Sequence, residues 1–210
     1  MSDRSVPEIF RAVVGFDPGS VIEHVDKAME AKVPVEEILN DGLIAAMDEV
    51  GRRFTNGEVF VPEMLMAAQS MKVGLERIKP LLTDEGAEYL GVAVIGTVKG
   101  DLHDIGKNLV GMMLGGAGFD VIDLGVDVDP EEFVQTAIEN QAALVGLSAL
   151  LTTTMPAMAA TVAALKEAGV PAKCIVGGSP VTRDWAERIG ADGFADDAPA
   201  AVALARQLVS

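Results

Sequence analysis

A short polar segment contains the strongest candidates for metal chemistry in this chain. Its residues run Val98-Lys99-Gly100-Asp101-Leu102-His103-Asp104-Ile105-Gly106-Lys107. Asp101 and His103 are two apart, so in an extended loop their side chains can lie on the same side. A carboxylate that hydrogen-bonds to one imidazole nitrogen fixes the tautomer of the ring and raises its basicity, which leaves the other nitrogen to bind a metal. The segment therefore predicts a single histidine ligand, His103, oriented by Asp101.

This segment has two other interpretations, a phosphate-binding loop and a histidine that caps a helix. Its glycines, followed by a lysine, resemble a phosphate-binding loop, but five residues separate Gly100 from Gly106 where that motif has four. Asn108 also replaces the Ser or Thr that would bind magnesium, and the carboxylates of Asp101 and Asp104 would repel phosphate. A histidine that merely caps the following helix remains an open alternative.

Three further segments combine small and hydroxyl-bearing residues. They are Ser148–Met155, with one serine and three threonines, Gly177–Pro180, with adjacent glycines, and Ala195–Ala198. Each also has an ordinary structural explanation. Thr153 or Thr154 could cap a helix, Gly-Gly is a common turn, and the last segment could cap the final helix. Taken together with the histidine segment, they favour a slot lined by backbone and hydroxyl groups, suited to a long neutral ligand tail.

The C-terminal half has the alternating pattern that would bring these segments together. Short apolar runs are expected to form strands at Leu90–Thr97, Asp120–Leu124, Leu144–Leu147, Cys174–Gly177 and Gly193–Ala195. Helical stretches follow them at Lys107–Leu114, Pro130–Asn140, Met155–Ala168, Arg183–Ile189 and Pro199–Val209. This alternation predicts an α/β fold with a doubly wound, five-stranded parallel sheet in the order 2-1-3-4-5. Ligands of such sheets bind beyond the carboxyl ends of the strands, where all four segments fall.

The N-terminal half has helical periodicity instead. Apolar residues spaced by three or four predict helices over Pro7–Val14, Val21–Lys32 and Val35–Arg53, and a last one that begins at Pro62 and ends at Pro80. These helices would form a four-helix cap bundle. The polar segment at residues 83–88, TDEGAE, marks the boundary between a helical cap domain, 1–86, and a ligand-binding domain, 88–210.

Charge and composition exclude several classes of partner. With 16 basic and 32 acidic residues the net charge is −16, which argues against nucleic acid and against an anionic membrane surface. No uncharged apolar run of about 18 residues is present, so no membrane span is expected. The N-terminal sequence lacks an apolar secretion segment, and Cys174 is the single cysteine, so we expect a cytoplasmic protein without internal disulfides.

The segment Val92–Gly125, with Asp101-x-His103-x-x-Gly106 at its centre, resembles the cobalamin-binding domain of cobalamin-dependent methionine synthase. It resembles even more closely the corrinoid proteins of methanol and methylamine methyltransferase systems, which also carry an N-terminal helical cap. The resemblance covers nearly the whole chain, and its extended motif includes the Ser148 loop and Gly177-Gly178. It implies that the cofactor is cobalamin or a related corrinoid, with cobalt as the metal.

The resemblance also implies roles for individual residues. His103 would be the lower axial cobalt ligand, displacing the cofactor's own benzimidazole, and Asp101 would hydrogen-bond to it. Thr154 stands where methionine synthase has a serine that completes a proton relay with the Asp and His. Threonine keeps the hydroxyl, but its methyl group restricts the rotamer. Asp101, His103 and Thr154 are therefore the predicted catalytic residues.

Other residues would contact the cofactor without taking part in the relay. Ser148 and Thr152 would contact the nucleotide tail, Gly177 and Gly178 would line its slot, and Ala198 would close it. Phe54 and Val61 match apolar cap residues that cover the upper, methyl-bearing cobalt face, although periodicity alone favours a place in the bundle core. The remaining predicted cofactor contacts are Gly100, Leu102, Asp104, Ile105, Gly106 and Leu150.

The function implied by the resemblance is that of a methyl carrier. The bound cobalt would cycle between cobalt(I) and methylcobalt(III), between a substrate:corrinoid methyltransferase and a corrinoid:acceptor methyltransferase, with a reductive activase as a third partner. The alternatives are the small subunit of a radical mutase, which generally lacks the helical cap, and a cobalamin-dependent sensor, for which no DNA-binding module is evident. A receiver-type signalling domain would leave His103 and the helical half unexplained.

Overall fold

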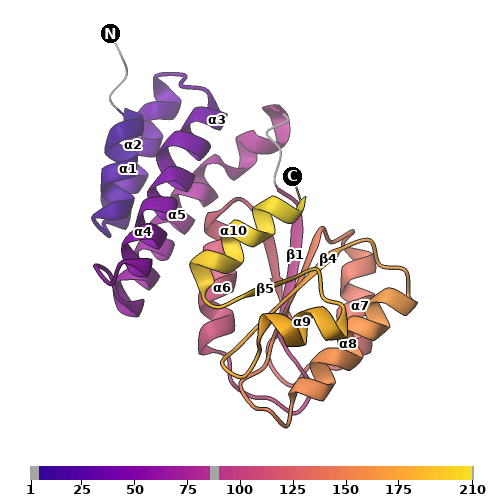
Figure 1. Cartoon of the computed structure of the whole chain (residues 1–210). Coiled ribbons are helices and arrows are strands. Elements are labelled where there is room, and N and C mark those ends of the chain that lie inside the picture. The colour runs from indigo at the N-terminus through magenta and orange to yellow at the C-terminus, as the bar shows by residue number, and fades with distance from the viewer. Residues whose placement is uncertain (1–4, 86–89, 210) are drawn as a thin grey trace. The chain divides into compact units, whose positions relative to one another are not determined.

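A computed structural model describes residues 5–85 and 90–209 of the chain. It divides into two compact units, residues 1–88 with 115–118, and residues 89–114 with 119–210 (Figure 1). The first contains the helical half of the sequence, and the second contains the parallel sheet.

The helical unit is built from amphipathic helices around a shared apolar core. Its elements are α1 (Ser5–Val14), α2 (Pro18–Glu30), α3 (Val35–Glu37), the π-helix η1 (Ile38–Ile44), α4 (Ala45–Thr55) and α5 (Val61–Glu85). Asp17 caps α2, because its carboxylate accepts a hydrogen bond from the backbone N–H of Ser20 at 3.0 Å. The fully buried side chains Ile9, Leu43, Met64 and Met71 come from three helices, α1, η1 and α5. The predicted helical bundle is thereby confirmed.

Two details of the helical unit differ from the sequence prediction. The helix expected over Val35–Arg53 contains the π-helical turn η1, and Gly42 within it packs so closely on α1 that an added Cβ would lie 3.1 Å from Ile9 Cγ2. The prediction that Pro80 ends the last helix is wrong, because α5 continues to Glu85. A proline inside a helix removes one backbone hydrogen bond and can kink the helix without ending it. Of the predicted boundary segment, residues 86–88 lie outside the described residues, and residues 83–85 belong to α5.

The second unit is the doubly wound sheet that the alternating pattern predicted. Its strands are β1 (Val92–Thr97), β2 (Asp120–Asp123), β3 (Leu144–Ser148), β4 (Lys173–Gly177) and β5 (Gly193–Ala195). All neighbouring pairs are parallel, in the order β2-β1-β3-β4-β5, which confirms the predicted order. The helices are α6 (Ile105–Gly116), α7 (Pro130–Glu139), α8 (Met155–Glu167), α9 (Arg183–Ile189) and α10 (Ala198–Val209).

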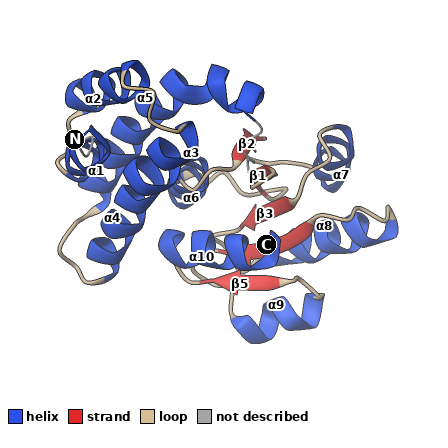
Figure 2. Ribbon diagram, turned by 90° about the horizontal axis from the view of Figure 1, so that it is seen from above, coloured by secondary structure: helices blue, strands red, loops and turns tan. Residues whose placement is uncertain are grey.

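Helices cover both faces of this sheet. Figure 2 shows α6 and α10 on one face and α7 and α8 on the other. Phe133 of α7 and Met158 of α8 are fully buried against Val94 and Val145 of the sheet. On the opposite face α6 approaches β1 so closely that a Cβ on Gly111 would lie 2.5 Å from Ile95 Cδ1. This packing fixes the carboxyl ends of the strands, from which the candidate loops extend.

Candidate functional site

Asp101 and His103 face each other in the loop that connects β1 to α6. Oδ1 of Asp101 lies 2.7 Å from Nδ1 of His103 and also accepts the backbone N–H of His103 at 3.1 Å. The Asp101 side chain is fully buried, whereas that of His103 is 51% exposed. One nitrogen of the ring is therefore held by the protein, and the ring itself reaches the surface. This arrangement is the one expected of a histidine that is oriented to bind a metal through Nε2.

The other oxygen of Asp101 is held from the loop after β3. Oδ2 accepts the hydroxyl of Thr154 at 2.7 Å and the backbone N–H groups of Leu150 and Leu151 at 2.8 and 3.3 Å. The Thr154 hydroxyl also lies 2.9 Å from the Leu151 carbonyl oxygen, a second acceptor for its single proton. Thr154 is at the N-cap position of α8, yet its side chain makes no capping hydrogen bond. The structure thus joins Thr154, Asp101 and His103 in one hydrogen-bonded chain, which the threonine methyl group does not prevent.

The electrostatic state of Asp101 follows from these contacts. Burial alone would raise the pKa of its carboxyl group, but the hydrogen bonds from Thr154, His103 and the Leu150 N–H outweigh burial and bring the pKa well below its usual range. The carboxylate is therefore ionised at neutral pH. An ionised carboxylate accepts a hydrogen bond from Nδ1–H, which leaves the Nε2 lone pair free for a metal.

The β1–α6 loop is fixed by Thr97, which sequence reasoning did not single out, and by Gly100, which it did. Thr97, the fully buried last residue of β1, donates its hydroxyl hydrogen bond to the carbonyl oxygen of His103 at 2.9 Å. Gly100 has φ +82°, a left-handed conformation that favours glycine. A threonine at the carboxyl end of an otherwise apolar strand was the available signal for Thr97, because a buried hydroxyl needs a partner.

Exposed apolar side chains lie next to the histidine in sequence. Leu102 is 71% exposed and Ile105 79%, and Leu150 in the neighbouring loop is also exposed. Leu151, which was not predicted, is exposed as well. A Cβ added to Gly106 at the start of α6 would meet no atom within 4 Å. Large apolar side chains and open space around one imidazole fit a flat, largely apolar ligand that carries its own metal.

The remaining predicted residues of the sheet unit lie at or near the carboxyl ends of its strands. Ser148 ends β3 and Gly177 ends β4. Gly178 has φ +124°, and a Cβ there would lie 1.9 Å from the Ala149 carbonyl oxygen, so two loops meet at this glycine. Three more predicted residues have these positions: Thr152 exposed, Ala198 buried at the start of α10, and Asp104 exposed and accepting a hydrogen bond from Asn108. Their contacts with a cofactor stay predictions.

Lys107 is an unexpected buried charge in α6. Its side chain is 4% exposed, and its Nζ lies 2.6 Å from Oδ1 of Asp123 at the end of β2 and 2.6 Å from the side-chain oxygen of Asn108. An ammonium group held in this way is not available to a phosphate, which agrees with the rejection of a phosphate loop. Asp123 is itself tied to the next loop, because it accepts the backbone N–H of Gly125 at 2.8 Å.

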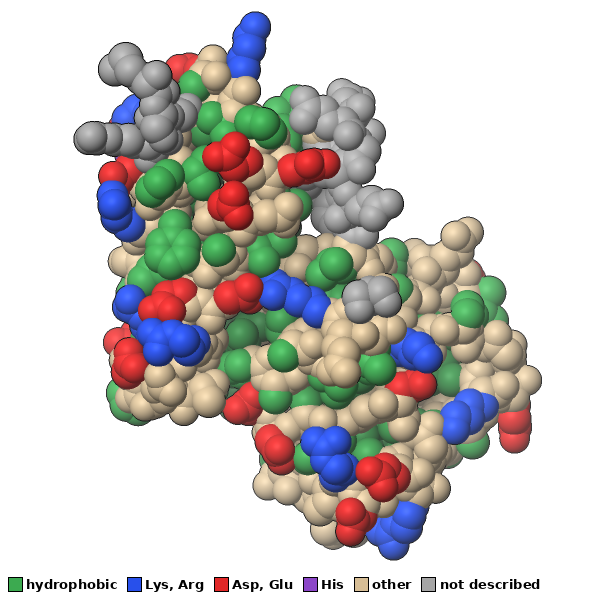
Figure 3. Space-filling model, turned by 45° about the horizontal axis from the view of Figure 1, so that its top comes forward, with side chains coloured by type: hydrophobic (Ala, Val, Ile, Leu, Met, Phe, Trp, Pro, Cys, Tyr) green, Lys and Arg blue, Asp and Glu red, His purple; other side chains and the backbone are tan. Residues whose placement is uncertain are grey.

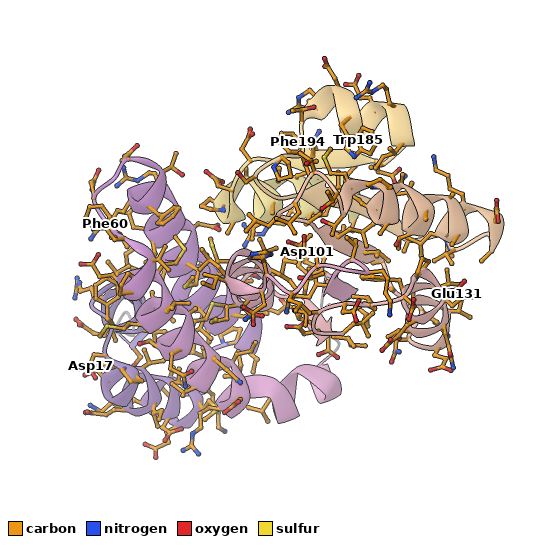
Figure 4. The ribbon with its side chains drawn as sticks, turned by 90° about the horizontal axis from the view of Figure 1, so that it is seen from below. Asp17, Phe60, Asp101, Glu131, Trp185 and Phe194 are labelled. Atoms are coloured by element: carbon orange, nitrogen blue, oxygen red, sulfur yellow. The ribbon has the colours of Figure 1, made fainter. Side chains whose placement is uncertain are left out.

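In the helical unit, the two predicted residues differ in exposure. Phe54 in α4 is half-buried, and Val61, the first residue of α5, is 37% exposed. Phe60 beside it is 65% exposed and projects from its unit in Figure 4. Asp101 is labelled in the same view, within the sheet unit. A role of Phe54 and Val61 over the cobalt stays a prediction.

Basic side chains are scattered on the face of the molecule drawn in Figure 3. They lie singly or beside acidic ones instead of forming a continuous basic patch. Within the described ranges, no three His, Cys, Asp or Glu side chains are grouped as a metal site, and no helix is long and apolar enough to cross a membrane.

Fold and site together define a class of protein: a doubly wound domain with one imidazole, oriented by a buried carboxylate, exposed at the carboxyl edge of its parallel sheet. Comparison with known families identifies the cofactor. Models of B12 binding domains match residues 91–204 and, separately, residues 7–79. The chain belongs to the B12-binding corrinoid proteins, and it binds cobalamin or a related corrinoid.

Individual relatives match over almost the full length of the chain. It is 44% identical over 204 residues to dimethylamine corrinoid protein 3 of Methanosarcina acetivorans, covering 96% of this chain and 95% of the relative. Trimethylamine corrinoid protein 1 of the same organism is 42% identical, with 94% of each chain covered.

Solved structures agree. A cobalamin-binding protein from Desulfitobacterium hafniense matches with a TM-score of 0.80 at 34% identity, over 96% of this chain and 97% of the other. A chain of the methanol:cobalamin methyltransferase complex from Methanosarcina barkeri matches with a TM-score of 0.86 at 30% identity, over 100% of this chain and 81% of the other. The mutase-subunit and sensor alternatives find no support among these matches.

Proposed function

We propose that this chain is a methyl-group carrier whose corrinoid would be held at its cobalt by His103. The observation that carries the proposal is the contact between Asp101 and Nδ1 of His103 at 2.7 Å, with Asp101 buried and the imidazole half exposed. When bound, the corrinoid supplies a cobalt centre that can take up a methyl group and give it up again. The protein supplies ligation, orientation and shielding.

The residues around His103 have complementary tasks in this proposal. Asp101 holds the Nδ1 proton and thereby keeps the ring in the orientation and tautomer that ligation requires. Thr154 and the Leu150 N–H hold the carboxylate in place. The Asp101 carboxylate would also hold a proton at Nδ1 of His103 while Nε2 faces the cofactor. Leu102, Ile105 and Leu150 provide apolar contact area for a flat macrocycle.

Donor and acceptor chemistry belongs to partner proteins in this proposal. The partners are a substrate:corrinoid methyltransferase, a corrinoid:acceptor methyltransferase and a reductive activase. The names of the relatives, dimethylamine and trimethylamine corrinoid proteins, make methylated amines the donors to test first. The net charge of −16 favours partners with basic docking surfaces over nucleic acid.

A stoichiometric transfer assay tests the proposal. The full chain is reconstituted with cobalamin, reduced, and mixed with a dimethylamine methyltransferase and radiolabelled dimethylamine. We expect about one label per chain, retained by the protein until an acceptor methyltransferase and a thiol acceptor are added. The His103→Ala variant, loaded to the same corrinoid content, controls for transfer to loosely bound cofactor. A loaded wild-type chain that takes up no label from any methylated amine, methanol or methyl ether system would contradict the carrier function.

A further inference from the structure

The loop between β2 and α7 runs beside the histidine loop and is hydrogen-bonded to it along its length. The backbone N–H of Thr97 donates to the Gly125 carbonyl at 3.0 Å, and that of Val128 donates to the Thr97 carbonyl at 3.1 Å. Beyond the end of β1, the backbone N–H of Asp127 donates to the carbonyl oxygen of Asp101 at 3.0 Å. These hydrogen bonds extend the pairing of β1 beyond the end of the strand. The last of them reaches Asp101, the residue that orients the imidazole.

Asp127 makes a second contact with the same short segment. Its Oδ1 accepts the backbone N–H of Gly100 at 2.8 Å. The Lys99–Gly100 and Asp101–Leu102 peptide groups, which lie on either side of the Gly100–Asp101 peptide, are therefore both held by Asp127. Its carboxylate holds the first and its main chain holds the second. The backbone N–H of Asp101 is also satisfied, because it donates to the Val98 carbonyl at 3.1 Å.

The backbone of Asp127 is in an unusual conformation. Its φ is +56°, in the left-handed region that costs most residues free energy and that Asn, Asp and Gly tolerate best. Residues held in such conformations are commonly found where a site needs a fixed geometry. Here the conformation accompanies an N–H directed at the Asp101 carbonyl and a carboxylate directed at the Gly100 N–H. Lys99 lies 3.6 Å from the Asp127 carboxylate and 3.0 Å from that of Asp129, which adds a weak, exposed ion pair.

From these contacts we propose that Asp127 is a positioning residue for the corrinoid ligand: it clamps the Gly100–Asp101 peptide segment and so holds the Asp101 carboxylate against His103. Asp127 itself touches neither the imidazole nor the Thr154 hydroxyl, so its effect is transmitted through the position of Asp101. The inference rests on the proposed ligand role of His103, and it adds a determinant outside the Asp-x-His-x-x-Gly motif.

Three substitutions separate the two contributions of Asp127. Asp127→Asn keeps an acceptor and a residue that tolerates positive φ. Asp127→Gly keeps the backbone conformation but removes the acceptor for the Gly100 N–H. Asp127→Ala removes the acceptor and adds backbone strain. Gln141→Ala is the matched control, because Gln141 has φ +49°, is exposed, and lies before the amino end of β3, at the opposite edge of the sheet.

Two measurements on the full chain are needed. Hydrogen exchange of the cofactor-free protein reports the amides of Gly100 and His103. Electron paramagnetic resonance of the cobalt(II) form, with histidine-labelled protein, reports the fraction of corrinoid ligated by His103. We expect Asp127→Ala to accelerate exchange of both amides by about tenfold, because one hydrogen bond is lost and the backbone is strained. It should also lower the histidine-ligated fraction. Asp127→Gly should be intermediate, and Asp127→Asn should stay within about twofold of wild type.

The Gln141→Ala control shows which result would contradict the positioning role of Asp127. Gln141→Ala, at a position of similar φ far from the histidine loop, should leave both readouts at wild-type values. If Asp127→Ala also leaves exchange at Gly100 and His103 unchanged, Asp127 is an ordinary turn residue and the inference is wrong. If the wild-type protein itself shows no coupling to histidine nitrogen, the ligand role of His103 fails, while the exchange comparison still decides the clamp.

Discussion

The Thr154 hydroxyl donates to the Asp101 carboxylate at 2.7 Å, on the oxygen that does not face His103. A hydroxyl in the loop after β3 thus supports an imidazole in the loop after β1, and the carboxylate between them is buried. Because the two loops meet at the Asp101 carboxylate, a substitution in either loop should alter how firmly the His103 imidazole is oriented.

Replacing Thr154 by valine should separate shape from hydrogen bonding. Thr154→Val keeps the branched side chain but leaves Oδ2 of Asp101 with backbone donors alone. We expect a loss of about 1–3 kcal/mol in the free energy of unfolding, the usual range for a buried hydrogen bond to a charged group. Thr154→Ser, which retains the hydroxyl, is the control and should lose less than about 1 kcal/mol. Urea denaturation of the cofactor-free protein measures both, and equal losses for the two variants would refute a role of the hydroxyl.

Asp101→Asn should weaken ligation by His103. Both carboxylate oxygens face donors, so the amide nitrogen of an asparagine would meet an N–H or O–H group whichever way it is turned. Loss of a partner that orients a metal-bound histidine typically lowers metal affinity by ~10–100-fold. His103→Ala is the reference for complete loss of ligation. Spectral titration with cobalt(III) cobalamin compares the three proteins, and wild-type spectra for Asp101→Asn at every pH would show that the carboxylate is dispensable.

The ion pair between Lys107 and Asp123 should respond unequally to removal of its partners. Lys107 is buried whereas 40% of the Asp123 side chain is exposed, so water can replace the lysine at Asp123 but not the aspartate at Lys107. Asp123→Asn should therefore cost about 2–4 kcal/mol, because it leaves a buried ammonium without its counter-charge. Lys107→Met should cost about 1 kcal/mol or less. Denaturant melts measure the difference, and the reverse order would mean that burial of Lys107 is not the dominant effect.

Alanine substitutions at two glycines should distinguish a glycine that folding requires from a glycine that cofactor binding requires. Gly178→Ala should destabilise the cofactor-free protein by about 3 kcal/mol or more, because its φ is +124° and its Cβ would collide with the Ala149 carbonyl. Gly106→Ala meets open space at the start of α6, so stability should be unchanged or higher by up to about 1 kcal/mol.

For Gly106→Ala, the affinity for the corrinoid should fall although the stability of the protein does not. If the open space belongs to the cofactor, Gly106→Ala should weaken corrinoid binding by about tenfold or more, equivalent to ~1.4 kcal/mol. Fluorescence titration with cobalamin provides the measurement. Unchanged affinity in a stably folded Gly106→Ala variant would remove Gly106 from the predicted cofactor contacts.

The sheet was predictable from sequence because hydrophobic runs and intervening helices follow simple periods. The strand order and the position of the histidine loop at the carboxyl edge followed from that alternation. Helix ends were harder. Pro80 suggested a stop, yet the helix continues, since the cost of one lost hydrogen bond can be offset elsewhere in a long helix.

Contacts between distant loops could not be read from spacing. Thr154 and Asp101 are 53 residues apart, and nothing local to the threonine distinguishes a helix cap from a hydrogen bond to a carboxylate. The left-handed backbone of Asp127 likewise has no unique sequence signal. Lys107 follows a glycine as in a phosphate loop, and only the structure shows that it is buried. Such contacts depend on which loops the topology brings together, and the parallel sheet decides that.

Ligation of cobalt by His103 is the central claim, and the cobalt(II) form allows a direct test. The full chain is loaded with cobalamin carrying nitrogen-15 in its benzimidazole, reduced by one electron, and studied by electron paramagnetic resonance. The account predicts coupling to a nitrogen that is unaffected by the cofactor label, that changes when the protein's histidines carry nitrogen-15, and that disappears in His103→Ala. Coupling to the labelled benzimidazole nitrogen in the wild-type protein would contradict it.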